Sequence, residues 1–245
     1  MLDRHPISRV VLIAAVVSVS AMSAAEAALL WEGDPAKGRG VFKLVGNGNC
    51  ADGTIEAVMD ADPNRGLVWR YHKPAESNRC ESHGIRVDGR NFVFENGQTY
   101  YLGWWSRLTS TANNNANFQW KSYGDGHIQN YPVVLKMIDG RMTLMQRQPG
   151  GVNTFLWSRP IAANGWNHYA MALKLSNELT GGYIEFWFNG VRQTFTTGSQ
   201  RFDCRLFDSG NHNCPKWGVY GGTGRVMDNF VSGLKVGTTL ADVLR

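Results

Sequence analysis

Short runs of apolar residues alternate with polar clusters along the whole chain after residue 28. The runs are rich in Val, Ile, Phe, Tyr and Trp, and clusters of Gly, Asn and Asp separate them at about the length of a strand. A helical period is confined to a short turn over residues 239–244. The pattern therefore predicts an all-β protein.

Two hairpins stand out in this pattern. Residues 132–148 contain two apolar segments that meet at Asp139-Gly140, and residues 168–190 contain two more that meet at Gly181-Gly182, with a further turn at Asn189-Gly190. Asp-Gly and Asn-Gly adopt the positive φ angles that tight hairpin turns require. About a dozen strands close most economically as two sheets packed face to face. We predict one domain over residues 28–245, a two-sheet antiparallel β-jelly roll sandwich.

Residues two apart in a strand share a face. Around Phe118, we expect Phe118 and Trp120 to face the core. The polar and aromatic residues of this and three other strands then lie on open faces, in the sets Asn117, Gln119, Lys121 and Tyr123; Arg79, Glu81 and His83; Lys216, Gly218 and Tyr220; and Tyr183, Glu185, Trp187 and Asn189. A purely structural sandwich needs only solvated groups there, so these stripes indicate a binding surface.

The first 27 residues have the layout of a secretory signal peptide. Arg4 and Arg9 precede an apolar run over residues 10–17, and the small residues of Ala25-Glu26-Ala27 follow. No later run approaches the ~20 apolar residues that a membrane span needs. We therefore expect an exported protein, extracellular or periplasmic, that does not bind a membrane.

The net charge of +5 favours a polyanionic partner. Because the sequence contains no basic run and no nucleic-acid motif, we expect an acidic polysaccharide rather than a nucleic acid, and a monomer. The four cysteines lack CxxC spacing, and export favours two disulfides. Four cysteines allow three pairings. We favour Cys204–Cys214, which closes a short loop, with Cys50–Cys80, which closes a longer one and ties down the N-terminal segment.

The sequence lacks the motifs that several classes of enzyme use for catalysis. No phosphate loop, HExxH or GxSxG occurs, and no tight carboxylate pair, so a glycoside hydrolase would have to use Glu81 and Glu185. The Arg, Gln, His, Lys and Tyr side chains of the open faces suit β-elimination on a uronic acid. Donors neutralise the C6 carboxylate, a base removes the C5 proton, and an acid protonates the leaving oxygen.

Four segments resemble, in order, the strand motifs of jelly-roll polysaccharide lyases. These are Arg-Cys-Glu-Ser-His at 79–83, Phe-Gln-Trp-Lys at 118–121, residues 182–190, and Lys-Trp-Gly-Val-Tyr at 216–220. The group includes heparin-lyase-I-like enzymes, glucuronan lyases and alginate lyases, with RSEL or RTELR, QxH or QWK, and KxGxY motifs. The resemblance runs from about residue 31 to residue 236.

The resemblance implies roles for individual residues. Gln119 and Arg79 would neutralise the uronate carboxylate, and Tyr220 would act as the acid and also as a candidate base. Alginate lyases usually carry His where this chain has Lys121, and often a second Arg where it has His83. A His on the first strand looks more like glucuronan lyases, so we predict that His83 is the base or a carboxylate neutraliser and that the substrate is polyglucuronate. The remaining predicted substrate-binding residues are Lys121, Lys216 and Trp187.

Such a lyase requires no cofactor. Lectin-like sandwiches often hold a structural calcium, and Asp34 and Asp228 are the candidate ligands, with a turn Asp and a strand-edge Asp as the alternative reading. Three alternatives stay open: an alginate- or heparin-type lyase, a non-catalytic carbohydrate-binding module on the same sandwich, and the hydrolase with Glu81 and Glu185.

Overall fold

A computed structural model describes residues 28–46, 48–210 and 212–244. The predicted signal peptide over residues 1–27 lies outside the described residues. Within them, no helix is long and apolar enough to cross a membrane. The helical elements are single 3-10 turns: η1 (Pro35–Lys37), η2 (Arg39–Val41), η3 (Pro149–Gly151) and η4 (Leu240–Asp242).

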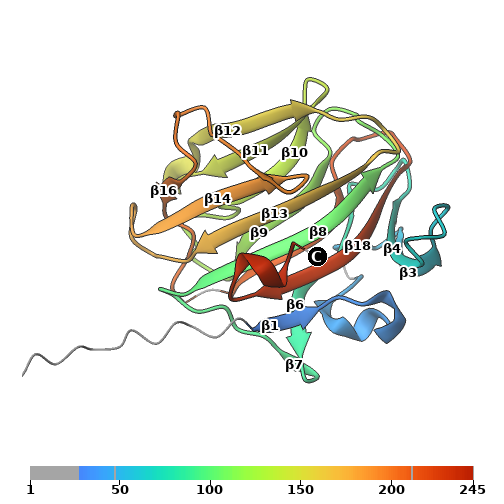
Figure 1. The fold of residues 1–245 in the computed structure, drawn as a ribbon, viewed down its shortest axis with the longest axis horizontal. Coiled ribbons are helices and arrows are strands. Elements are labelled where there is room, and N and C mark those ends of the chain that lie inside the picture. Colours follow the sequence, from blue (N-terminus) through green and yellow to red (C-terminus); the bar gives the residue numbers. More distant parts are fainter. Residues whose placement is uncertain (1–27, 47, 211, 245) are drawn as a thin grey trace, which may run out of the picture.

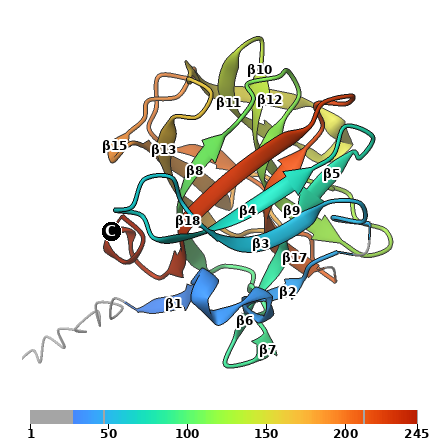
Figure 2. The same ribbon diagram turned by 90° about the vertical axis from the view of Figure 1, so that its right-hand side faces the viewer.

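The chain forms two large antiparallel sheets that lie one over the other, as the all-β jelly-roll prediction requires (Figures 1 and 2). The nine-stranded sheet runs in the order β15 (Val191–Arg192), β14 (Gly182–Phe188), β13 (Trp166–Lys174), β8 (Thr99–Leu108), β18 (Met227–Gly237), β4 (Leu67–Lys73) and β3 (Thr54–Met59), with β1 (Leu29–Glu32) paired to β18 and β16 (Phe202–Cys204) paired to β14.

The six-stranded sheet runs in the order β12 (Asn153–Pro160), β11 (Arg141–Arg147), β10 (Val133–Ile138), β9 (Ala116–Tyr123), β17 (His212–Tyr220) and β5 (Arg79–Glu81). A small sheet of β2 (Phe42–Leu44), β6 (His83–Val87) and β7 (Arg90–Asn91) projects from one end of the sandwich, at the bottom of Figure 2.

Aromatic side chains fill the space between the two large sheets. Trp104 from β8 stacks on Phe118 from β9 with ring centroids 4.7 Å apart, and it meets Trp217 from β17 edge-on at 6.3 Å. All three side chains are at most 1% exposed. Burial of such large apolar groups from both sheets is the main force that holds the sandwich together.

The predicted hairpins are confirmed. Ile138 pairs with Arg141 across Asp139 and Gly140, whose φ angles of 49° and 73° are those of the tight turn that the sequence predicted. β13 and β14 form the second hairpin, and the predicted helical turn at the C-terminus is η4.

A β-bulge in β9 overturns the predicted face of Asn117. The pairing with β10 passes from Phe118 directly to Ala116, so Ala116 takes the open face instead. The Asn117 side chain turns inward, where its amide donates to the hydroxyl of Ser106 in the other sheet at 3.4 Å.

One of the two predicted disulfides is correct. Cys50 and Cys80 are bonded, which ties the segment after β2 to β5. The predicted Cys204–Cys214 bond is wrong: both residues are free, buried thiols. Cys204 belongs to β16 in the nine-stranded sheet and Cys214 to β17 in the six-stranded sheet, so proximity in sequence does not bring the two together.

Candidate active site

Gln119 lies at the middle of the open face of the six-stranded sheet. It pairs with Lys216 of β17 on one side and Val134 of β10 on the other, so the three side chains share a face. The Gln119 amide donates to the Glu81 carboxylate at 2.6 Å, and the Lys216 ammonium donates to the other oxygen of Glu81 at 2.7 Å. Lys216 also donates to Asn49 at 2.9 Å. Glu81 therefore holds Gln119 and Lys216 in place.

These three residues differ in whether their side chains reach a pocket. Lys216 is 0% exposed and Glu81 is 2% exposed, whereas Gln119 reaches the surface of a pocket. The ion-pair partner of Glu81 is Lys216, not Arg79 two residues away. Lys216 was predicted to bind substrate, but its side chain is fully buried and does not line the pocket.

Tyr220 and Arg79 form the next part of the face. The Arg79 guanidinium lies 4.5 Å from the centre of the Tyr220 ring, and the two residues pair between β17 and β5. Gly218 makes this geometry accessible. Its φ is +148°, and a Cβ at this position would lie 2.2 Å from the Cys80 carbonyl oxygen, so only glycine allows β17 to lie this close to β5 where its pairing with β9 is irregular.

One pocket of about 220 Å³ brings Gln119 and Tyr220 together. The rest of its lining is supplied by Asn114, Ala116, Tyr131, Val134, Lys136 and Met145. Lys136 donates to Asn114 at 3.1 Å, and burial together with the charge of Arg147 lowers the Lys136 pKa. Two of the three predicted catalytic residues therefore share a cleft that also presents a cation.

Lys121 and Tyr123 continue β9 away from this pocket. The Lys121 ammonium donates to Asn130 and lies 4.9 Å from the centre of the Tyr123 ring. Burial, together with the charges of Lys216 and Arg79, lowers the Lys121 pKa to about 8. The side chain thus titrates close to neutral pH.

His83, the third predicted catalytic residue, does not line the pocket. The extended segment breaks at Ser82, whose hydroxyl bonds Tyr71 in the other sheet, and His83 begins β6 in the small sheet. Its ring stacks on Tyr123 at 4.0 Å and is 6% exposed, and neither ring nitrogen has a partner among the described residues. Burial and the nearby charges of Lys43 and Lys216 lower its pKa to about 3, so the ring is neutral.

Several cations on this face have no acidic partner in the part of the chain that the structure describes. Among the described residues, no carboxylate lies within ion-pair distance of five of its basic side chains: Arg79, Lys121, Lys136, Arg141 and Arg147. On the nine-stranded sheet, Arg70, Arg107 and Arg192 are each paired with Asp or Glu, whereas Lys73 and Lys174 are not paired within the described ranges. Unpaired cations around a pocket favour an anionic ligand.

Sequence reasoning missed four residues of the site: Asn49, Asn130, Tyr131 and Lys136. Alternation along residues 131–138 would have placed Lys136 on the same face as Val134, which pairs with Gln119. Asn49 and Asn130 lie outside strands, where no periodicity marks the direction of a side chain.

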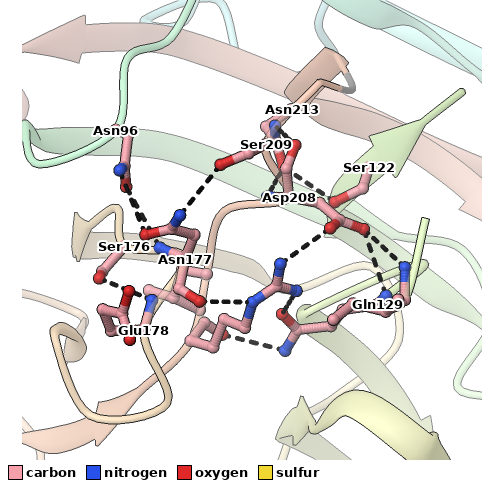
Figure 3. A network of polar contacts seen from close by, with 12 residues as sticks. Asn96, Ser122, Gln129, Ser176, Asn177, Glu178, Asp208, Ser209 and Asn213 are labelled. Atoms are coloured by element: carbon pink, nitrogen blue, oxygen red, sulfur yellow. Dashed lines mark hydrogen bonds and ion pairs between the residues drawn. The ribbon is translucent and has the colours of Figure 1, made fainter. Parts of the chain in front are cut away.

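A buried polar network fixes the loop that carries Asn130 and Tyr131. Asp208 accepts from the Arg205 guanidinium at 2.8 Å and from the Ile128 and Gln129 backbone amides at 2.8 and 3.3 Å. Figure 3 shows how this network joins the segment around Gln129 to the segments around Asn177 and Asn213. The network anchors the loop before β10 against the chain that enters β17.

Trp187 and Glu185 lie far from this site. Both belong to β14, and Trp187 packs with Ala170, Ala172 and Val243 on the outer face of the nine-stranded sheet, beneath the C-terminal turn drawn in red in Figure 1. Trp187, which was predicted to bind substrate, therefore lies on a different sheet from Gln119 and Tyr220. Glu185 pairs with Arg192 and Arg201. Because Glu81 and Glu185 lie on different sheets, they cannot flank one glycosidic bond, which removes the hydrolase alternative.

Asp34 and Asp228 do not come together. Asp34 caps η1 by accepting from the Ala36 amide at 2.9 Å, and Asp228 accepts from Arg70 and His72 at 2.9 and 2.8 Å. Gly33 bonds Leu234, which is six residues along β18 from Asp228, or about 20 Å. The predicted two-residue calcium site does not form. Among the described residues, no group of three or more His, Cys, Asp or Glu side chains is arranged to hold a metal.

The comparisons with known proteins agree with this geometry. The model of the polysaccharide lyase family matches residues 52–231. No curated protein matches the chain. The structure of an endo-β-1,4-glucuronan lyase from the fungus Trichoderma reesei is similar, with a TM-score of 0.62 and 16% identity, over 82% of this chain and 93% of that one.

Two further solved structures share the fold. An alginate lyase from Corynebacterium sp. is similar with a TM-score of 0.52 and 12% identity, over 74% of this chain and 79% of that one. A cellulose induced protein is similar with a TM-score of 0.53 and 10% identity, over 78% and 88%. Because the family match covers well over half of its length, this chain belongs to the polysaccharide lyase family and is a polysaccharide lyase.

Proposed function

We propose that this lyase cleaves a 4-linked polyuronate by β-elimination and prefers polyglucuronate. The observation that carries the proposal is the pocket lined by both Gln119 and Tyr220, on a face where five cations lack an acidic partner among the described residues. A polyanion would be drawn to such a face, and its reacting sugar would meet both an amide donor and a proton-transfer group.

The reaction divides between the residues as follows. Gln119 donates a hydrogen bond to the C6 carboxylate, with Arg79 supplying positive charge beside it, and this stabilises the negative charge that develops as the C5 proton leaves. Tyr220 takes the C5 proton and returns a proton to the departing O4, so that a C4–C5 double bond forms as the C4–O4 bond breaks. The Arg79 guanidinium lies 4.5 Å from the centre of the Tyr220 ring, so its charge stands beside the group that transfers the proton.

The other predicted residues act indirectly in this scheme. Lys121 binds a neighbouring uronate, since it lies two residues from Gln119 on the same face. Glu81 and Lys216 orient the Gln119 amide. His83 takes no proton-transfer step, because it is absent from the pocket lining and its ring is buried against Tyr123.

The likeness to the fungal glucuronan lyase over 93% of that chain supports polyglucuronate over other uronans.

The test is a panel of polyglucuronate, alginate and heparin, read by the ultraviolet absorbance of unsaturated uronate ends. We expect product from polyglucuronate first, and loss of at least about a hundredfold in rate for Tyr220→Phe, as for removal of an acid–base group. Tyr183→Phe is the matched control, because Tyr183 also lies under an arginine, at 3.9 Å from Arg201, but on the nine-stranded sheet.

The other possible results of this panel bear on the proposal in different ways. Absence of product from every uronan contradicts the proposed reaction, and binding without product identifies a carbohydrate-binding module. Full activity in Tyr220→Phe removes Tyr220 from the proton transfer.

We also propose that residues 1–27 direct export and that residues 28–245 act as one monomeric domain. The Cys50–Cys80 disulfide supports an oxidising compartment. The N-terminal sequence of the mature protein tests the cleavage site.

A further inference from the structure

Phe155 is an exposed aromatic side chain at the far edge of the six-stranded sheet. It belongs to the edge strand β12, is 52% exposed, and makes no ring contact with another aromatic side chain among the described residues. It pairs with Met145 of β11, which lines the pocket of Gln119 and Tyr220. Residues paired in this way share a face, so Phe155 lies on the same open face as Gln119.

The register connects the two positions in a straight row across four strands. Gln119 pairs with Val134, Val134 with Met145, and Met145 with Phe155. Three interstrand spacings separate the ends of this row, which is about 14 Å. That distance exceeds one sugar unit, so a chain with one residue at Gln119 would place a different residue at Phe155.

A second hollow of about 400 Å³ surrounds Phe155. Its lining includes the polar residues Arg141, Thr143, Ser158 and Thr196 and one acidic residue, Asp139. The Thr143 position pairs with Lys136, which lines the first pocket, so the two hollows adjoin on β10 and β11. The row of residues from Gln119 to Phe155, with the two hollows along it, is called the track below.

The charge along this track is suited to a uronate. Arg141 is held in place by two hydrogen bonds to Ser158, at 3.1 Å to the hydroxyl and 3.0 Å to the carbonyl, and these use only part of its guanidinium. Lys136 stands at the other end of the track without an acidic partner among the described residues. An acidic polysaccharide complements both the exposed ring and the cations.

We propose that Phe155 and Arg141 form a remote subsite that binds the same polyuronate chain away from the cleaved bond. The Phe155 ring stacks on the apolar face of a sugar, and Arg141 pairs with a uronate carboxylate. The identity of the sugar rests on the proposed function above, whereas the existence of a second contact point rests on the register and on the exposure of Phe155.

The test is the affinity for oligoglucuronates of increasing length, measured by calorimetry in a Tyr220→Phe background so that turnover does not consume the ligand. We expect affinity to rise once an oligomer is long enough to reach from Gln119 to Phe155. Phe155→Ala should remove this rise, weakening the long oligomers about tenfold and leaving the short ones unchanged. Arg141→Gln should reduce the rise for oligoglucuronates but not for oligomers whose carboxylates have been reduced to alcohols.

Val191→Ala is the matched control. Val191 is 64% exposed in β15, the edge strand of the other large sheet, so it tests the effect of removing an apolar group from a sheet edge. The subsite is refuted if Phe155→Ala keeps the length dependence, if Val191→Ala loses it equally, or if the parent protein shows none. If only Phe155→Ala abolishes the length-dependent binding, and the protein with Tyr220 intact yields no unsaturated ends, the subsite is supported and the proposed reaction is contradicted.

Discussion

Asp208→Asn tests whether the buried network of Figure 3 organises the active-site loop. Asp208 is 4% exposed and its side chain accepts from Arg205, Ile128 and Gln129. The substitution is nearly isosteric, so it removes the negative charge without leaving a cavity. The Arg205 guanidinium, itself 7% exposed, then loses its ion-pair partner.

The expected loss is large because a charge remains buried. Removing one partner of a buried ion pair costs about 3–5 kcal/mol. Urea unfolding at neutral pH should show a fall of this size in the free energy of unfolding, with an unchanged dependence on denaturant concentration. The double variant Asp208→Leu with Arg205→Met should recover part of the loss, since it leaves no unpaired charge.

The same substitution should also affect catalysis. The network holds the loop with Asn130 and Tyr131, so we expect the KM for polyglucuronate to rise more than kcat falls. Asp203→Asn serves as the control, because Asp203 lies exposed in β16 close by in the sequence, and its loss should stay within about 0.5 kcal/mol. A fall of less than about 1 kcal/mol for Asp208→Asn would show that the pair does not hold the loop.

Three further predictions follow from the site. Glu81→Gln should lower kcat, because Gln119 loses its charged acceptor, and it should also lower the free energy of unfolding, because the buried Lys216 loses its ion-pair partner. Kinetics at a temperature where circular dichroism shows the variant folded check this, and unchanged kcat contradicts the positioning role. The Lys121 pKa of about 8 lies below the ordinary value of 10.5, so Lys121 loses its charge and uronate binding should weaken as pH rises through 8. Between about pH 8 and 10.5 the unfolded chain binds this proton and the folded protein does not, so the free energy of unfolding should rise with pH over that range. Both trends should vanish in Lys121→Met. Reducing Cys50–Cys80, 30 residues apart, should cost about 3–4 kcal/mol by thermal unfolding, and a negligible shift would contradict it.

Part of this structure follows from local patterns. Alternation placed Phe118 and Trp120 in the core and Gln119 on the open face, since successive side chains of a strand must point to opposite sides. Asp139 and Gly140 form the predicted turn because these residue types tolerate positive φ. The order of motifs along the chain was sufficient to indicate the family that the comparisons show.

Tertiary structure decided which of the candidate residues meet. Period-two alternation tells which residues share a face of a strand, but not in which sheet the strand lies, so Trp187 was predicted to bind substrate although β14 lies in a different sheet from Gln119. The bulge in β9 turns the Asn117 side chain away from its predicted face, and the strand break at Ser82 places His83 in another sheet. Both depend on how the strands pair, which residue types alone do not encode.

The partners of charged and sulfur-containing groups were likewise settled only in three dimensions. Glu81 bonds Lys216, 135 residues away, rather than its neighbour Arg79, and Cys204 stays apart from the nearby Cys214. The sequence by itself determined the all-β class, the core-facing positions and the turn sites, because these depend on interactions within a few residues. Contacts between distant residues depend on how all the strands are arranged in the two sheets. That arrangement brings Gln119 and Tyr220 into one pocket and leaves His83 outside it.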